Sequence, residues 1–278
     1  MTWRDVFSRR IGAIRSARPI AGGDINDAFA LETSDGTRMF VKTRERAPAT
    51  MYAREASGLA WLDVGALRVP KVIAHDASFL ALEWVESGAR ARSYDDELGR
   101  GLAALHRAGP ERFGLDHDNF VGSLPQRNDP SDDWFSFFAE RRLLDQLRLA
   151  VANGRATTAM RRGIEKLVDV LADLVPAEPP SRLHGDLWGG NVMTDERGAP
   201  VLIDPAVYGG HREIDLAMLQ LFGGATRRML DAYDEAFPLE RGWRDRVELH
   251  QLYPLLVHVN LFGGGYVASV ERVLDRYV

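Results

Sequence analysis

The chain has 278 residues, 45% of them hydrophobic and 27% charged, which is typical of a folded protein with two domains or one large one. Its formal charge of −5 argues against a nucleic-acid or anionic-membrane surface, and the absence of cysteine excludes disulfides and thiol catalysis. Residues 1–10 lack the apolar core of a signal peptide, and the most apolar stretch, 252–270, is interrupted by Pro254 and three glycines. We expect a cytoplasmic protein that neither spans a membrane nor binds nucleic acid.

Residues 11–42 read as strands and turns. Residues 28–32 and 39–42 are expected to form neighbouring strands of a hairpin. Ahead of them, a turn-rich segment is a candidate loop that brings backbone N–H groups to nucleotide phosphates, and the residues assigned to it are Gly22, Gly23, Ile25 and Asn26. A plain β-hairpin fits the same residues. No Walker-type or Rossmann-type glycine motif occurs.

A helix is expected over residues 49–63. One of its faces carries a carboxylate among apolar side chains and consists of Tyr52, Glu55, Leu59 and Leu62. Because a carboxylate on a buried face is costly unless it is paired, we predict an ion pair between Glu55 and Lys42, which ends the preceding strand. The pattern also fits Glu55 as a solvated charge.

Two further strands, 71–74 and 79–85, lead to a break at residues 86–89, which we interpret as a linker. The chain then turns helical, with a capping-box-like start at Ser93 and Asp96 and a second helix capped by Ser131. The remaining helices are expected at 157–174, 213–222, 226–237 and 243–262. We therefore predict an α+β chain with a β-rich part containing one helix, 1–87, and a mainly helical part, 88–278.

The most informative stretch is Arg182 to Met218. Asp186 is followed five positions later by Asn191, and an apolar strand then delivers Asp204. Phosphoryl transfer needs an acid that orients and deprotonates the attacking hydroxyl, and two oxygen ligands for Mg²⁺. We assign the first role to Asp186 and the second to Asn191 and Asp204. This spacing is the catalytic-loop and metal-loop pattern of protein-kinase-like enzymes.

The motif H-G-D-L-W-G-G-N at 184–191, continued by D-P-A-x-x-x-G-H-R-E-x-D-L-A from 204, resembles the fructosamine-kinase (ketosamine-3-kinase) family, relatives of aminoglycoside and choline kinases. The resemblance implies a protein-kinase-like two-lobe fold with ATP between a nucleotide-binding N-lobe (1–87) and a catalytic and substrate-binding C-lobe (88–278). It also implies phosphorylation of the 3-hydroxyl of a ketosamine on a small amine or protein lysine, and hence deglycation. A kinase of the aminoglycoside or choline type and a non-catalytic nucleotide-binding module stay open as alternatives.

Further roles follow from the same resemblance. Lys42, held by Glu55, positions phosphate oxygens, and the hinge residues that offer backbone groups to adenine are Glu83, Trp84 and Val85. Trp188, beside Asp186, is a candidate aromatic wall for the substrate. The substrate cleft also contains His258 and Tyr266, and the catalytic loop is supported by His184 and Asp215. His258 and Tyr266 fit packed positions equally, and Asp215 fits a helix N-terminal acid. Residues 208–211 are expected to form a flexible loop.

Overall fold

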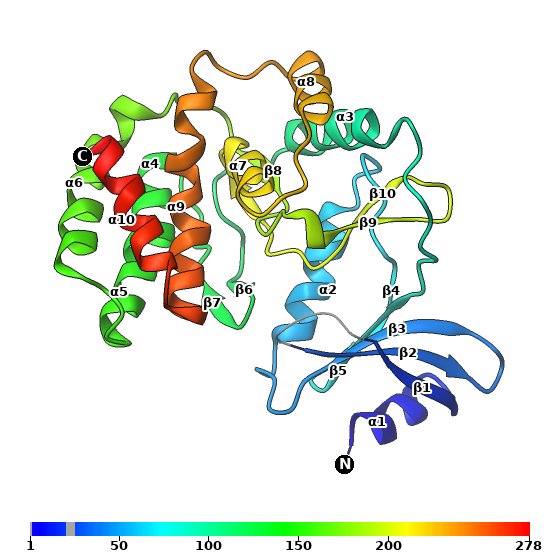
Figure 1. Ribbon diagram of the computed structural model, residues 1–278. Coiled ribbons are helices and arrows are strands. Elements are labelled where there is room, and N and C mark those ends of the chain that lie inside the picture. Colours follow the sequence, from blue (N-terminus) through cyan, green and yellow to red (C-terminus); the bar gives the residue numbers. More distant parts are fainter. Residues whose placement is uncertain (1, 21–25) are drawn as a thin grey trace.

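The computed structural model describes residues 2–20 and 26–278, so Gly22, Gly23 and Ile25 of the expected phosphate loop lie outside the described residues. The N-lobe contains a five-stranded antiparallel sheet with the strand order β1-β2-β3-β5-β4 (Figure 1). Its strands are β1 (Ile14–Ile20), β2 (Asp27–Thr33), β3 (Arg38–Thr43), β4 (Val72–Asp76) and β5 (Phe79–Glu83). The register pairs Lys42 on the central strand β3 with Ala28 on one side and Leu80 on the other.

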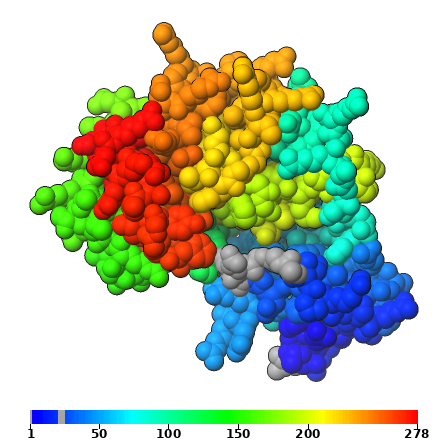
Figure 2. All heavy atoms as spheres, in the orientation of Figure 1, coloured from blue at the N-terminus to red at the C-terminus, as the bar shows by residue number. Residues whose placement is uncertain are grey.

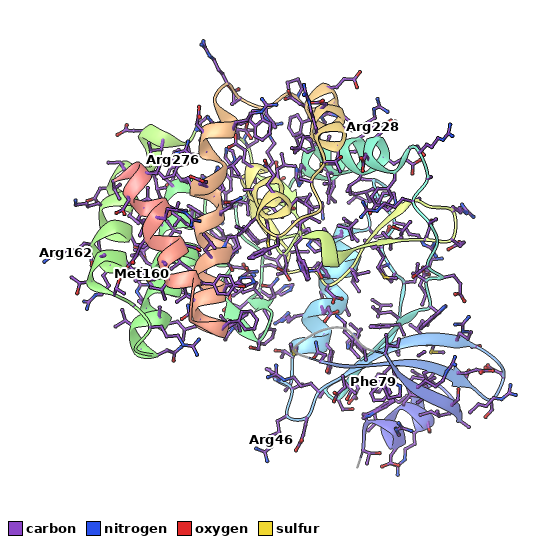
Figure 3. All side chains as sticks on the ribbon, viewed as in Figure 1. Arg46, Phe79, Met160, Arg162, Arg228 and Arg276 are labelled. Atoms are coloured by element: carbon purple, nitrogen blue, oxygen red, sulfur yellow. The ribbon has the colours of Figure 1, made fainter. Side chains whose placement is uncertain are left out.

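Two helices accompany the sheet, so the expectation of one helix in residues 1–87 is wrong. The additional helix is α1 (Trp3–Arg10), which packs Phe7 against inner side chains of β2 and β3 and places its ring centroid 5.5 Å from that of Phe79. Phe79 is labelled in Figure 3. Its start was readable in the sequence, because Thr2 and Asp5 form a capping box in which each side chain bonds the other's backbone N–H.

The second N-lobe helix, α2 (Met51–Leu62), packs against the C-lobe as well as against the sheet. Tyr52, Leu59 and Leu62 belong to a core cluster that also contains C-lobe residues such as Leu102. At its end, the Arg182 guanidinium stacks 4.2 Å from the Trp61 ring and donates a hydrogen bond to the Trp61 carbonyl. The helix that carries Glu55 is therefore fixed to the lobe that carries Asp186.

The C-lobe is mainly helical, and in Figure 2 it forms the larger body, coloured from cyan to red. Its elements are α3 (Tyr94–Arg107), β6 (Asn119–Val121), β7 (Leu124–Gln126), α4 (Trp134–Phe138), a π-helical turn (Ala139–Leu144), α5 (Asp145–Ala152), α6 (Thr158–Leu174), β8 (Ser181–Leu183), β9 (Val192–Thr194), β10 (Pro200–Leu202), β11 (Tyr208–Gly210), α7 (Glu213–Leu221), α8 (Arg227–Ala236), α9 (Trp243–Phe262) and α10 (Tyr266–Tyr277). Met160 of α6 and the aromatic residues of α4 pack in its core with α9 and α10 (Figure 3).

Ser93 is the N-cap residue of α3 as predicted but makes no capping bond, and the prediction that Ser131 caps the other helix is wrong, although both helices form. Ser93 has φ −85° and ψ −7°, and its side chain makes no capping bond. A capping side chain reaches the N–H groups of the first turn from an extended backbone, which Ser93 does not have. At the other helix the cap is Asp133, whose carboxylate accepts the Ser136 N–H at 2.7 Å, while Ser131 accepts the Asp133 N–H.

Residues 208–211 are also not the flexible loop that their glycines suggest. Residues 208–210 form β11, which pairs with β8 and is fully buried. A Cβ at Gly210 would lie 2.5 Å from a methyl carbon of Leu183, so this glycine permits close packing. None of the helices in the described part of the chain has the length and apolar composition needed to cross a bilayer.

Candidate active site

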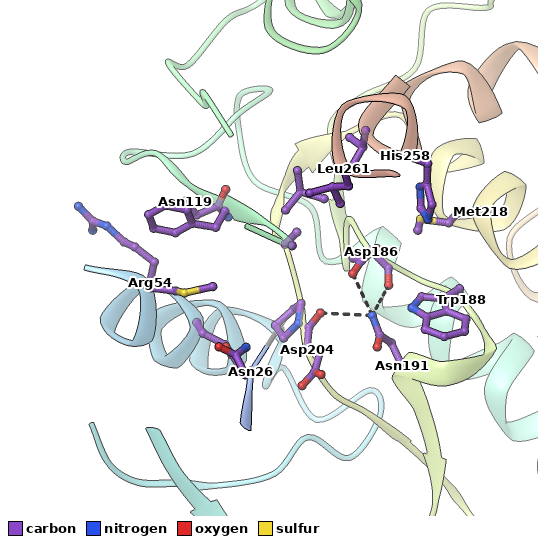
Figure 4. A pocket seen from close by; sticks show the side chains of 18 of the residues that line it. Asn26, Arg54, Asn119, Asp186, Trp188, Asn191, Asp204, Met218, His258 and Leu261 are labelled. Carbon is purple, nitrogen blue, oxygen red and sulfur yellow. Dashed lines mark hydrogen bonds between the residues drawn. The ribbon is translucent and has the colours of Figure 1, made fainter. Parts of the chain in front are cut away.

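The three predicted catalytic and metal-binding side chains meet at one point between the lobes. The short strand β8 leads into the loop that carries Asp186, and a 3₁₀ turn, Gly189–Asn191, precedes β9. The Asn191 amide donates to the Asp186 backbone carbonyl at 2.8 Å and to its carboxylate at 3.0 Å (Figure 4). A weaker bond of 3.5 Å reaches the carbonyl of Asp204, two residues after the end of β10. The β9–β10 hairpin therefore brings Asp204 back to the loop that carries Asp186 and Asn191.

Lys42 joins this group from the N-lobe sheet. Its ammonium lies 2.7 Å from the Glu55 carboxylate and 2.5 Å from the Asp204 carboxylate, and its side chain is 7% exposed. Burial by itself lowers the pKa of Lys42, but the Asp204 and Glu55 carboxylates more than offset this effect and raise it. Lys42 is therefore a fixed cation, and Glu55 is a buried partner, not a solvated helix charge.

We expect the Lys42–Glu55 pair to show strong energetic coupling. Lys42→Met and Glu55→Gln should each raise KM for ATP and destabilise the protein. Lys42→Met leaves the buried Glu55 carboxylate without its cation, at a cost of about 3–5 kcal/mol, whereas Glu55→Gln should cost less because Lys42 keeps Asp204 as a partner. The double variant should lose less free energy of unfolding than the two single variants together, with a coupling energy of about 0.5–3 kcal/mol. Urea unfolding and ATP kinetics of all four proteins measure it. Strictly additive effects would show that the two side chains act separately.

A buried carboxylate, that of Asp215, binds the backbone of the catalytic loop. Asp215, in the first turn of α7, accepts the His184 N–H at 2.7 Å and the Gly185 N–H at 3.0 Å. His184 uses Nε2 to bond the Ile203 carbonyl at 2.9 Å, and its Nδ1 accepts the Asp186 N–H at 3.3 Å. His106 completes the set with a 3.3 Å contact to Asp215. These bonds support positioning roles for His184 and Asp215, and the two roles stay proposals.

Asp186 opens to the cavity on one side and is surrounded by protein on the others. Burial, followed by the nearby Asp204 carboxylate, raises the pKa of Asp186 to about 7. A carboxylate with such a pKa is a stronger base than an exposed aspartate, which suits proton abstraction from a hydroxyl. A cation bound at Asp204 would lower this value by removing the repulsion between the two acids.

Asn191 and Asp204 also fit a hard divalent cation. The Asn191 amide nitrogen is occupied by Asp186, which leaves its oxygen as the available ligand atom. The Asp204 side chain is 40% exposed and lines the cavity. Carboxylate and carboxamide oxygens are ligands that Mg²⁺ accepts beside nucleotide phosphates. Asp204 has φ 57°, a left-handed conformation that aspartate and asparagine tolerate better than most residues.

These residues lie on a cavity of about 430 Å³ between the lobes. Asp186, Asn191 and Asp204 are central to it, with Arg54 and Asn119 on one side and Trp188, Met218 and His258 on the other (Figure 4). The structure brings all three predicted substrate residues to the cavity, and it also brings Asn26, Lys42 and Glu55 there. Whether they bind ligands as predicted stays a proposal.

Sequence reasoning missed part of the cavity wall, above all the β6–β7 hairpin, whose lining residues are Asn119, Phe120, Val121 and Gly122. Gly122 at the tip has φ 57°, so the glycine between two apolar pairs was a usable hairpin signal. Arg54, Phe222 and Phe262 were missed as well, and no local sequence pattern marks them.

The hairpin is anchored by a buried amide network. The Asn119 side chain donates to the Val207 carbonyl at 2.9 Å and accepts from Gln126 and Asn128, each at 2.8 Å. Asn128 in turn accepts from Arg142, a fully buried residue of the π-helical turn whose guanidinium stacks on aromatic rings. The network ties the hairpin to the segment that follows Asp204, so this cavity wall is anchored to the catalytic centre.

The predicted hinge residues do not line the cavity with their side chains. The Glu83 carboxylate pairs with Arg68 at 3.0 Å, Trp84 stacks under Arg38 at 4.6 Å, and Val85 is buried. A role in adenine binding would rest on their backbone groups alone, and it stays a prediction.

A lysine–glutamate pair on a β-rich lobe, facing two aspartates and an asparagine on a helical lobe, defines an ATP-dependent phosphotransferase with a protein-kinase-like fold. Comparison with known proteins agrees with this class. A family model for fructosamine kinase matches residues 4–278, nearly the whole chain. The protein belongs to the fructosamine kinase family, which confirms the predicted family and fold class and removes the non-catalytic alternative.

Several relatives support this assignment. A solved structure from Thermobifida fusca, assigned as a fructosamine-3-kinase, has a TM-score of 0.90 at 41% identity, covering 99% of this chain and 97% of that one. A protein of Enterococcus faecium assigned as a ketoamine kinase is 37% identical, with 93% and 94% of the two chains covered. A chloroplastic protein-ribulosamine 3-kinase of Arabidopsis thaliana is 36% identical, with 93% and 81% covered. A choline kinase from Streptococcus pneumoniae shares the fold alone, with a TM-score of 0.65 at 16% identity and 98% and 96% covered.

Proposed function

We propose that this protein transfers the γ-phosphoryl group of ATP to the 3-hydroxyl of a ketosamine, either free or on a protein lysine, and thereby promotes deglycation. Asp186 orients the hydroxyl and accepts its proton as the oxygen attacks phosphorus, and the bond between the γ-phosphorus and its bridging oxygen breaks to release ADP. Lys42, held by Glu55, positions phosphate oxygens. Mg²⁺, held by Asn191 and Asp204, would neutralise charge on the phosphates. The cytoplasm is our expected compartment.

The observation that carries the substrate assignment is the character of the cavity. Its described lining contains three carboxylates, Glu55, Asp186 and Asp204, and all three belong to the catalytic centre. Trp188, beside Asp186, is 40% exposed and lines the same space. An aromatic face suits the C–H face of a sugar, whereas a polycationic aminoglycoside needs several acids. Two other acids, Asp132 and Glu213, pair with Arg112 and Arg246 and do not line the cavity.

A phosphotransfer screen tests this function. Ribulosamines and fructosamines should be phosphorylated far better than choline or kanamycin, and phosphorus NMR should place the phosphate on O3.

Trp188→Ala should raise KM for the ketosamine and spare KM for ATP, whereas Trp188→Phe, which keeps an aromatic face, should recover most of the loss. Turnover of aminoglycosides without turnover of ketosamines would overturn the substrate assignment and leave the kinase chemistry standing.

A further inference from the structure

Beyond Trp188, one end of the cavity is built from four aromatic rings. Phe222 follows α7, His258 and Phe262 lie on α9, and Tyr266 begins α10. The His258 ring lies 4.4 Å from Phe222, 5.4 Å from Phe262 and 4.9 Å from Tyr266, measured between ring centroids. These four residues are called the aromatic cluster below. They form one continuous apolar surface beside the catalytic carboxylates.

The end of α9 creates this surface. Helical spacing puts His258 and Phe262 on the same face, one turn apart, and that face lines the cavity. Gly263 and Gly264, with φ 68° and 60°, then reverse the chain with left-handed backbone that glycine adopts without strain. The reversal returns Tyr266 to the His258 ring. The cluster is therefore built by a helix end and a tight turn.

One member of the cluster, Phe262, is among the few exposed large hydrophobic side chains of the described residues, and the other three are half-buried. Among the described residues, the exposed large hydrophobic side chains are Val64, Ile73, Val151, Trp188, Phe262 and Val278. The two aromatic residues of this exposed set, Trp188 and Phe262, are 40% and 51% exposed, and both line the cavity. The four aliphatic residues of the exposed set lie outside the cavity. Apolar surface gathered in one cavity and left open to water is typical of a ligand-binding surface.

The cluster carries no ionised group of its own. His258 donates from Nδ1 to the Pro254 carbonyl at 2.8 Å, and burial lowers the pKa of His258, so the ring is neutral at physiological pH. None of the three carboxylates of the described lining belongs to the cluster. Aromatic faces of this kind attract methylene groups through apolar burial, and they attract an alkylammonium through the ring quadrupole. A polyanion or a polycation finds no complementary charges here.

We propose that the aromatic cluster is a binding subsite for the substituent on the ketosamine nitrogen, and that it favours an unbranched alkyl chain such as the methylenes of a lysine side chain. The proposal rests on the proposed function, because it needs the sugar to lie at Asp186 and Trp188. The substituent then runs along Phe222 and His258 and leaves the cavity past Phe262. The protein thus selects its substrate by the carrier amine as well as by the sugar.

Substrates with one sugar and different amines provide the test. Fructosamines made from methylamine, butylamine, hexylamine and the ε-amine of an Nα-acetyl-lysine amide should differ in kcat/KM. We expect a rise of about threefold for each methylene that enters the cluster, with most of the effect in KM. Equal kcat/KM for methylamine and butylamine carriers would overturn the proposal.

A variant locates the effect. Phe262→Ala should lower kcat/KM for the butyl, hexyl and lysine carriers about tenfold and change the methyl carrier much less, while Phe262→Leu should recover most of the loss. Ile73→Ala, at an exposed apolar position of β4 outside the cavity, is the matched control and should match the wild type for every carrier. An equal loss for all carriers in Phe262→Ala would place Phe262 against the sugar and refute a carrier subsite.

Calorimetry separates this proposal from the proposed function. Binding of the N-methyl and N-hexyl fructosamines to the wild type and to Phe262→Ala is measured without nucleotide, so it needs no turnover. The N-hexyl compound should bind about tenfold more tightly to the wild type, and Phe262→Ala should remove that advantage. If neither compound is phosphorylated but the preference persists, the proposed function fails and the subsite stands. If the two compounds bind equally well, the subsite fails whatever the kinase assay shows.

Discussion

Asp186→Asn should lower kcat by about 10²–10⁴-fold, the range typical of losing a positioned general base, and leave KM for ATP nearly unchanged. Asparagine keeps an oxygen that accepts the hydrogen bond from Asn191, so the loop geometry should survive. It cannot accept the proton of the substrate hydroxyl. Single-turnover phosphotransfer at saturating ATP measures the chemical step. A variant that turns over at the wild-type rate would show that Asp186 is not the base.

The same substitution should not cost stability. In the metal-free protein, burial raises the pKa of Asp186 to about 7 from an unfolded value of 3.8. Between these two pH values the unfolded chain releases this proton before the folded one does, so this group lowers the free energy of unfolding as pH rises. Asparagine removes that effect. In chelator at pH 8, Asp186→Asn should therefore need more urea to unfold than the wild type, and the exposed Asp132→Asn is the control for a lost charge.

Asp204→Asn should abolish most of the magnesium dependence of ATP binding. Asp204 is the ionised member of the expected metal pair, and a metal ion contributes several kcal/mol of charge stabilisation, so kcat should fall by about 10²–10³-fold. Asparagine is preferred over alanine for this test because position 204 has φ 57°, and its amide oxygen can still accept from Lys42. Asn191→Ala removes a neutral ligand, so it should weaken Mg-ATP binding less.

Calorimetric titration with Mg-ATP and with ATP in chelator distinguishes the outcomes. Asp204→Asn should bind the two forms with similar affinity, whereas the wild type should prefer Mg-ATP. Asn191→Ala should keep part of that preference. Equal Mg-ATP affinity in the wild type and in Asp204→Asn would contradict the assignment of Asp204 as a metal ligand.

Much of the catalytic centre could be predicted because its spacing is local. Asp186 and Asn191 lie on one short loop, and Asp204 follows a strand that pairs back onto it, so hairpin geometry brings them together. The Lys42–Glu55 pair was predicted by a different argument, the cost of an unpaired carboxylate on an apolar helix face, and the 2.7 Å contact confirms it. Both arguments need few residues and no knowledge of packing.

The helix caps and residues 208–211 show where local reasoning fails. Ser93 has a residue type suited to a cap, but its backbone is helical and not extended, so its side chain makes no capping bond. Gly209 and Gly210 suggest mobility, yet they belong to a buried strand in which Gly210 gives space to Leu183. Glycine permits both uses, and the neighbours that decide between them are distant in sequence.

The family, the fold class and the set of residues expected to transfer phosphate could be predicted without coordinates, because these depend on a contiguous motif. The tertiary structure was needed to show what surrounds that set: the β6–β7 hairpin as a cavity wall, α2 fixed to the C-lobe, and Phe222 and Phe262 beside His258. The physical reason is that a cavity is the space left between packed elements. Its lining depends on where helices end and cross, and residues that meet there share no local pattern in the chain.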